Sequence, residues 1–136
     1  MKEKIPPQEY KRILDGIQLE NVLVKNINAK IDHEILKEGL KINIKDNASY
    51  SLKDDGFIVE DKFSLYSRDK DRKIAIKIEC TYVLSFTSSC TITEEFFDIY
   101  KEISLPLNVW PFFREFVNSI TSRMNIPPLT LPLLIR

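Results

Sequence analysis

The stretch IAIKIECTYVLSF, residues 74–86, decides the fold class, because apolar side chains occupy every second position along it. A period of two places these side chains, from Ile74 to Phe86, on one face of a β-strand. The alternate positions mix polar residues such as Lys77 with apolar ones such as Val83. One face of this strand must therefore be covered by the rest of the domain. The other face is only partly solvated and is suited to meet another subunit.

Three further strands are expected before this one. Residues 17–25 are rich in β-branched and aliphatic side chains, and their alternation slips near Val22, which indicates a bulge. Residues 40–52 alternate apolar with polar side chains, and residues 57–66 do the same. The covered side of this third strand is expected to carry Phe57, Val59, Phe63 and Leu65.

The connections between these strands differ in length. Residues 54–56 (Asp-Asp-Gly) and 69–72 are turn sequences, and strands joined by short turns favour antiparallel pairing. The longer stretch 26–39, which holds the sole histidine, His33, is expected to be a crossing connection between the first and second strands.

On either side of the expected sheet the period becomes helical. Residues 8–15 have helical spacing and meet Gly16, a residue that readily takes the left-handed conformation closing a helix. Thr91 followed by Glu94 has the spacing of a capping box, and an apolar stripe then continues to near Pro106. These patterns predict a short N-terminal helix and a first C-terminal helix.

A second C-terminal helix is more clearly marked. Asn108 is expected to cap it, and Pro111 is tolerated in its first turn. The tail 127–136 is too rich in proline for a helix and too apolar to be free in water, so it is expected to dock. The apolar face of the helix is expected to carry Phe113, Phe116, Val117, Ile120 and Met124.

Length, charge and cysteine content restrict the class of protein. A chain of 136 residues fits one domain, 1–136, with one core, and 20 basic against 20 acidic residues leave no net charge to attract nucleic acid. The start lacks the apolar stretch of a signal peptide, and no uncharged apolar run approaches the ~20 residues that cross a bilayer. With only Cys80 and Cys90, a disulfide framework is excluded. We therefore expect a cytoplasmic protein with reduced thiols, without membrane insertion or nucleic-acid binding.

The sequence offers little catalytic chemistry. His33 lies alone in a charged segment and is expected to face solvent, and Cys80 is expected in the core. The glycines are scattered singly and form no phosphate cradle, and neither cysteine matches a zinc or redox spacing. Glu94 and Glu95 are favoured by the dipole of the helix that they begin. We expect no enzymatic activity, no metal and no cofactor.

Two segments resemble the SecB family. Residues 108–132, NVWPFFREFVNSITSRMNIPPLTLP, are similar to the main-helix signature of that family. In that signature a proline–aromatic pair leads to Arg-Glu, an amphipathic helix, a Ser-Arg near its end and a proline–leucine exit. Residues 17–27, IQLENVLVKNI, are similar to the family's first strand. With the order of four strands and then two helices, the resemblance covers nearly everything after the N-terminal helix.

The resemblance implies an α+β fold: a four-stranded antiparallel sheet with two C-terminal helices packed on one face, plus the short N-terminal helix. It also implies a homo-oligomer, a dimer of dimers, that holds unfolded client proteins. Such a chaperone needs exposed apolar grooves and no nucleophile or cofactor. The family places the grooves between the main helix and the connection after the first strand. The matching positions here are Ile27, Ala29, Ile31, Ile35 and Leu36 in the connection and Phe113, Val117, Ile120 and Met124 on the helix.

The sequence departs from the secretory members of the family at the residues that would engage the SecA motor. Asn26 and Lys30 stand where acidic residues would be expected, and the polar extension is missing after Arg136. These departures argue against delivery to SecA. Related SecB-like chaperones guard an antitoxin, so the expected clients are unfolded proteins or an antitoxin. An alternative stays open: a non-chaperone scaffold whose apolar strips serve only self-assembly.

Overall fold

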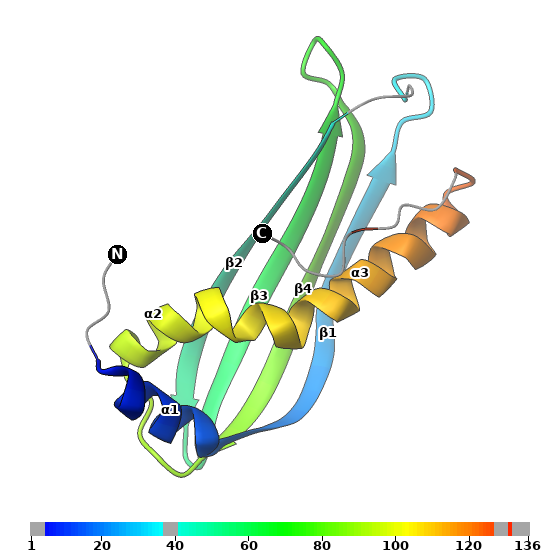
Figure 1. Cartoon of the computed structure of the whole chain (residues 1–136). Helices are drawn as coiled ribbons and strands as arrows, with labels where there is room; N and C mark the ends of the chain where they lie inside the picture. Colours follow the sequence, from blue (N-terminus) through cyan, green and yellow to red (C-terminus); the bar gives the residue numbers. More distant parts are fainter. Residues whose placement is uncertain (1–4, 37–40, 127–130, 132–136) are drawn as a thin grey trace.

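The computed structural model describes residues 5–36, 41–126 and 131 (Figure 1). It contains three helices and one sheet, and it confirms the expected α+β class and the order of elements. The elements are α1 (Pro7–Asp15), β1 (Ile17–Ile31), β2 (Ile42–Lys53), β3 (Gly56–Arg68), β4 (Ile74–Ser88), α2 (Glu94–Ile103) and α3 (Leu105–Arg123).

The four strands form an antiparallel sheet in the order β1-β4-β3-β2. Tight hairpins join β2 to β3 and β3 to β4, as the turn sequences predict, while the chain between β1 and β2 crosses from one edge of the sheet to the other. The long strand β4 lies between β1 and β3, so that Ile78 stands opposite Ala29 on one side and Leu65 on the other. A central strand of this kind explains why residues 74–86 carry the strongest alternation.

β1 is longer than its sequence predicts. The prediction that the connection begins at Asn26 is wrong, because residues from Asn26 to Ile31 continue the ladder with β4. The connection begins at Asp32, and residues 37–40 of the predicted stretch lie outside the described residues. The register of β1 shifts twice, between Leu19 and Asn21 and between Val24 and Asn26. The slip expected near Val22 is therefore present as two irregularities that flank it, and they interrupt the simple period of two.

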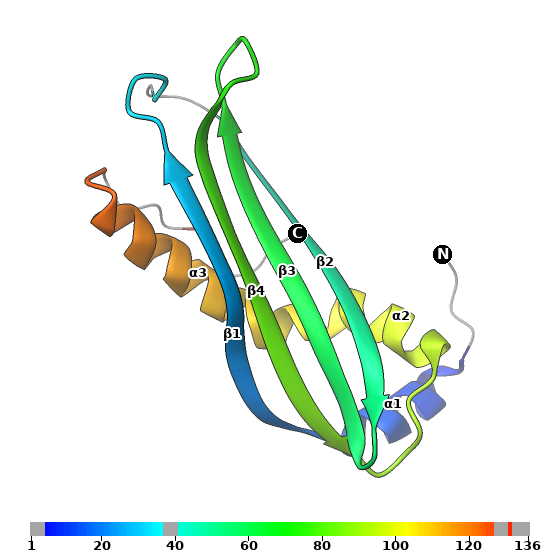
Figure 2. The same ribbon diagram turned by 180° about the vertical axis from the view of Figure 1, so that it is seen from behind.

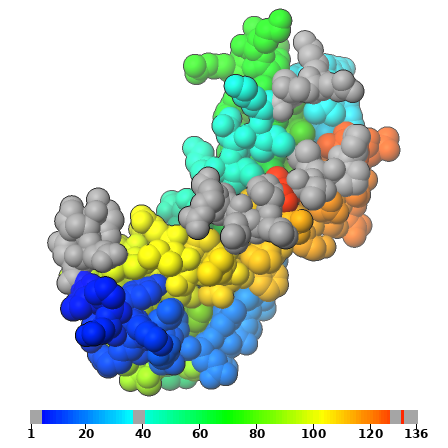
Figure 3. Space-filling model, in the orientation of Figure 1, coloured from blue at the N-terminus to red at the C-terminus, as the bar shows by residue number. Residues whose placement is uncertain are grey.

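The helices cover one face of the sheet, here called the core face (Figures 1 and 2). The side assignments predicted for β3 and β4 are confirmed: Val59, Leu65, Ile78 and Leu84 have no exposed surface. Trp110 from α3 is almost completely buried, and its ring centroid lies 6.1 Å from that of Phe63 on β3. In the space-filling view of Figure 3, α2 and α3 form a continuous ridge, and the green and cyan end of the sheet projects beyond it.

The caps of α2 and α3 differ from those predicted. Thr93, not Thr91, caps α2, and its hydroxyl accepts a hydrogen bond from the Phe96 backbone N–H at 3.1 Å. α3 begins at Leu105 rather than after Asn108, with a proline in its first turn. Asn108 consequently lies inside the helix, where its Nδ2 donates to the Tyr100 hydroxyl at 2.7 Å. Both errors have the same cause. A polar side chain near a helix end can hydrogen-bond either to a backbone N–H or to another side chain, and the local spacing does not tell which it will do.

Gly16 follows α1 as expected but for a different reason. Its φ of −92° is right-handed, so the predicted left-handed closure is wrong. A Cβ at this position would lie 2.2 Å from the Ser89 hydroxyl, and the Ser89 backbone N–H donates to the Gly16 carbonyl at 3.0 Å. The Ser89 hydroxyl would have to rotate away to admit a side chain here, and the backbone hydrogen bond ties α1 to the end of β4.

One residue of the predicted docking tail is described. Leu131 is buried, and its carbonyl accepts a hydrogen bond from Arg114 Nε on α3 at 2.7 Å. At this position the tail docks against α3, while residues 127–130 and 132–136 lie outside the described residues. None of the described helices is long and apolar enough to span a bilayer.

Candidate functional site

The sheet edge formed by β1 carries exposed apolar side chains. Leu19, Val24 and Ile27 have exposed fractions of 37%, 51% and 55%. They belong to the core face, because Val24 is the register partner of Tyr82 and Ile27 that of Cys80. The core face of β1 is thus left partly open to solvent, in contrast to β3 and β4.

A side chain of α3 extends this apolar surface. Phe112 is 47% exposed, and its ring centroid lies 6.3 Å from that of Tyr82, the register partner of Val24. Phe112 therefore stands over the same part of the sheet as Val24, beside the β1 edge. We call Leu19, Val24, Ile27 and Phe112 the β1–α3 strip. Exposed apolar side chains gathered in this way are typical of a surface that receives a partner.

The residues predicted to bind clients occupy three kinds of position. Ile27 belongs to the strip, and Met124 is half-buried at the end of α3. Phe113 and Val117 have no exposed surface, because they point from α3 onto the sheet; the ring of Phe113 is stacked 4.9 Å from that of Phe63. The remaining five are half-buried and pack against the core: Ala29, Ile31, Ile35, Leu36 and Ile120.

The sequence prediction missed Val24 and Phe112. Val24 follows the register shift between Leu19 and Asn21, which moves it to the core face of β1. A strict alternation begun at Ile17 would instead place it on the opposite face. Phe112 is one position before the buried Phe113, so it lies on the flank of the apolar stripe of α3 and not at its centre. A helical projection of residues 105–124 would have shown this flank.

The backbone of β1 adds a second means of contact. Among the described residues β1 is an edge strand, paired with β4 on one side only. The other side of an edge strand presents N–H and C=O groups that an extended polypeptide can pair with. An apolar strip beside such an edge suits a segment that offers apolar side chains and an extended backbone.

The core face also holds a buried carboxyl group. Asp61 on β3 is 1% exposed, and its Oδ1 has no hydrogen-bond partner. Burial, assisted by the neighbouring Asp46 carboxyl on β2, raises the pKa of Asp61 to about 8. Its register partner Tyr82 is likewise buried, with an unpartnered hydroxyl whose pKa is raised by burial. Asp61 is therefore mostly protonated at neutral pH and stands near the inner boundary of the strip.

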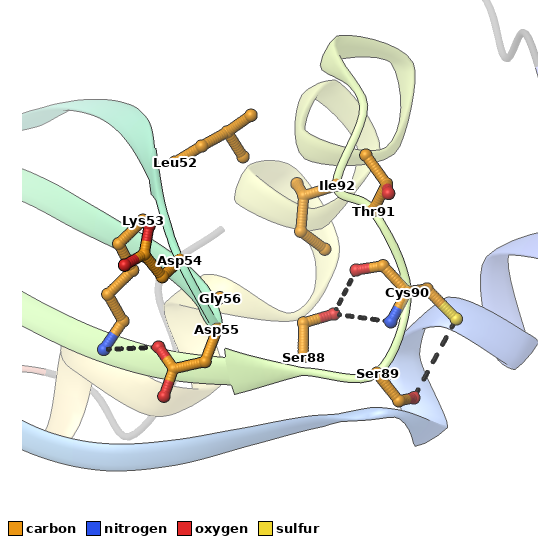
Figure 4. Close-up of a pocket in the computed structure, with 10 residues that line it drawn as sticks. All are labelled: Leu52, Lys53, Asp54, Asp55, Gly56, Ser88, Ser89, Cys90, Thr91 and Ile92. Carbon is orange, nitrogen blue, oxygen red and sulfur yellow. Dashed lines mark hydrogen bonds and ion pairs between the residues drawn. The ribbon is translucent and has the colours of Figure 1, made fainter.

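A separate hollow of about 310 Å³ lies where the β2–β3 hairpin meets the loop before α2 (Figure 4). Its polar groups bond to one another: the Ser88 hydroxyl donates to the Cys90 carbonyl at 2.6 Å, and Lys53 pairs with Asp55 at 3.7 Å. In the part of the chain that the structure describes, no group of three or more His, Cys, Asp or Glu residues could hold a metal ion. His33 is exposed and Cys80 is buried, as predicted.

Comparisons with known proteins rest on structure alone. No family model matches the sequence, and no curated protein matches it. A search of solved structures finds a Mycobacterium tuberculosis protein described as the Rv1957 SecB-like chaperone in complex with a ChAD peptide from the Rv1956 HigA1 antitoxin. The two chains are 19% identical, with a TM-score of 0.77 over 95% of this chain and 99% of that chain. The chain described here therefore has a SecB-like fold.

Proposed function

We propose that this protein is a molecular chaperone that binds unfolded or antitoxin-like client segments along the β1–α3 strip and keeps them from aggregating. One observation carries the proposal: Val24 and Ile27 on an edge strand are about half exposed, and the exposed ring of Phe112 lies against Tyr82, the register partner of Val24. Leaving such apolar surface in water costs free energy that a bound apolar segment recovers. The activity requires no nucleophile, metal or cofactor.

The structural likeness supports the same class of client. Rv1957, whose fold this chain shares, was solved with a peptide from an antitoxin. A short antitoxin segment is a suitable client for an apolar strip beside a free strand edge, because it can add a strand and insert alternate side chains. The positions first predicted for client contact remain part of the proposal where they keep exposed surface, which excludes Phe113 and Val117.

The proposal includes a homo-oligomer, a dimer of dimers. The open face of β4, which is opposite the core face, carries the half-buried Val83, and its neighbour Leu23 on β1 is 58% exposed. An interface between copies at this end of the open face, six residues along β4 from Lys77, would remove apolar surface from water. Delivery to SecA does not belong to the proposal. We place the activity in the cytoplasm, where Cys80 and Cys90 would stay reduced.

Replacing Ile27 by serine tests the strip. We expect Ile27→Ser to weaken client holding by about tenfold, because an apolar contact of this size contributes roughly 1.5–3 kcal/mol. Folding stability should change by less than ~1 kcal/mol, because the side chain is already 55% exposed. The measurement is light scattering from an unfolded client protein that aggregates on dilution, at increasing concentrations of wild type or variant.

Leu52→Ser is the matched control. Leu52 is an aliphatic residue on the opposite edge strand, β2, with an exposed fraction of 59%. Wild-type holding by this variant, together with the loss in Ile27→Ser, would support the strip. Equal holding by both folded variants would remove the strip from the client site. Loss of the oligomer together with holding in Ile27→Ser would favour the scaffold alternative, so the molar mass is measured in parallel.

A further inference from the structure

Figure 2 shows the face of the sheet opposite the helices. Strand register gathers a patch of lysine and asparagine residues on this face. Its side chains alternate with the buried ones: Lys62 lies between Asp61 and Phe63, and Lys77 precedes Ile78. Cross-strand register brings the members of this patch together from all four strands. We call the following residues the open-face patch: Asn26, Asn28, Lys30, Lys45, Lys62 and Lys77.

A carboxylate at the centre of the patch is already neutralised by its neighbours. Glu79 has a side chain that is 13% exposed, and its Oε2 accepts a hydrogen bond from the Tyr66 hydroxyl at 2.6 Å. Lys62 and Lys77 lie 3.7 Å and 3.9 Å from its two oxygens. The Tyr66 hydrogen bond and these lysines hold the pKa of Glu79 below its ordinary value, against the effect of burial. One largely buried negative charge is thus shared between two lysines, and positive charge remains in surplus.

Further lysines increase that surplus. Lys30 on β1 is the register partner of Lys77 on β4, so two like charges stand directly opposite each other. Such a pair destabilises the sheet rather than stabilising it. In the described part of the chain, no ion pair involves Lys30 or the exposed Lys45 on β2. Folding accounts for Lys77, which pairs with Glu79, but it gives Lys30 and Lys45 no anionic partner among the described residues. An anionic partner would relieve the repulsion between Lys30 and Lys77.

The patch also has hydrogen-bond donors and a hollow to receive a partner. A depression of about 350 Å³ is lined by Asn26, Ile27, Asn28, Lys62, Glu79 and Thr81. Asparagine amides and lysine ammonium groups are donors that pair with carboxylate oxygens. The depression therefore combines positive charge with donors at the β1 side of the open face.

We propose that the open-face patch binds an acidic, extended segment of a partner protein, separately from the clients held on the core face. Aspartate or glutamate carboxylates of that segment contact Lys30 and Lys77, and the asparagine amides bind its side chains. A polypeptide is favoured over nucleic acid because Tyr66, the aromatic residue of this face, is already engaged. Its hydroxyl bonds Glu79, and the Arg68 guanidinium lies 5.0 Å from its ring centroid. Stacking of bases would require a free ring.

The test uses a fluorescein-labelled, glutamate-rich peptide and its glutamine-substituted counterpart, with binding followed by fluorescence anisotropy at about 0.05 M salt. Wild type should bind the glutamate peptide and not the glutamine peptide. Lys30→Glu/Lys45→Glu should bind at least about tenfold more weakly, because two unpaired cations are reversed. Neither lysine makes an ion pair in the described structure, so the fold should persist, and client holding by this variant should be unchanged.

Lys11→Glu/Lys101→Glu is the control, since it makes the same change of net charge on the helices α1 and α2. Retained binding by this control supports the proposal. An equal loss in both double variants would overturn it in favour of general charge attraction. Three other results would also overturn it. The first is that wild type does not bind the glutamate peptide. The second is that wild type binds a single-stranded RNA more tightly than the peptide and that the patch variant loses this binding, and the third is that the molar mass of the oligomer falls in the patch variant. The last two would assign the patch to nucleic acid or to a second copy of the chain.

Discussion

Replacing Ile78 by aspartate should prevent stable folding. Ile78 has no exposed surface and lies on the central strand β4, between Ala29 and Leu65. A carboxylate there would lose its hydration without gaining a partner, at a cost of several kcal/mol in addition to the lost apolar burial. Domains of this size are stable by roughly 5–15 kcal/mol, so much of that stability would be removed. The measurement is urea unfolding followed by circular dichroism.

Ser85→Asp provides the comparison, because Ser85 is on the same strand but on the opposite face, where it is half-buried. This variant should keep a cooperative transition close to that of wild type. An Ile78→Asp protein with the same urea midpoint as wild type would mean that the covered face of the sheet has been assigned wrongly.

Replacing Asp61 by asparagine should stabilise the protein in alkaline solution and change little in acid. The pKa of Asp61 is raised to about 8 in the folded protein, first by burial and then by the Asp46 carboxyl. An aspartate in the unfolded chain titrates near 4, so between about pH 4 and 8 the folded state holds a proton that the unfolded state has released. The free energy of unfolding of wild type therefore falls across this range. The asparagine side chain cannot ionise, so the variant should avoid this loss, which is on the order of 5 kcal/mol at most.

The measurement is the difference in the free energy of unfolding between wild type and Asp61→Asn at several pH values. Taking the difference cancels the titration of groups that do not interact with Asp61. Asp46→Asn is a useful second variant, because removing the neighbouring carboxyl should lower the pKa of Asp61 and recover part of the loss. Parallel stability curves for wild type and Asp61→Asn would show that Asp61 titrates normally and is hydrated.

The periodic features of the fold could be predicted because they depend on local spacing. The alternation from Ile74 to Phe86 identified the covered face of β4, and helical spacing located α1, α2 and α3. The extent of β1 was missed for a different reason. Ile27, Ala29 and Ile31 alternate with Asn26, Asn28 and Lys30, so a period of two does continue to Ile31. The two register shifts in β1 put this alternation out of phase with the residues before it, so the strand does not read as one continuous pattern.

The candidate site was predicted less completely than the fold. An apolar stripe on a helix marks residues that become buried when the protein folds. It does not distinguish the centre of the stripe, such as Phe113, from its flank, such as Phe112. The depth of each side chain depends on where α3 crosses the sheet. In β3, Asp61 stands at one of the alternate positions that are otherwise apolar, so the pattern assigns it to the covered face. The pattern does not indicate that its Oδ1 lacks a hydrogen-bond partner.

The central claim is that the wild-type protein holds unfolded polypeptide on an apolar surface. It is tested most directly by titrating the purified protein into a fluorescently labelled, permanently unfolded polypeptide and following anisotropy and co-elution on a sizing column. The account predicts saturable binding, a complex that co-elutes, and competition by a second unfolded chain but not by a folded protein. A correctly folded protein that shows no binding at concentrations up to about 0.1 mM, well above the micromolar range of a moderate protein–peptide affinity, would contradict it.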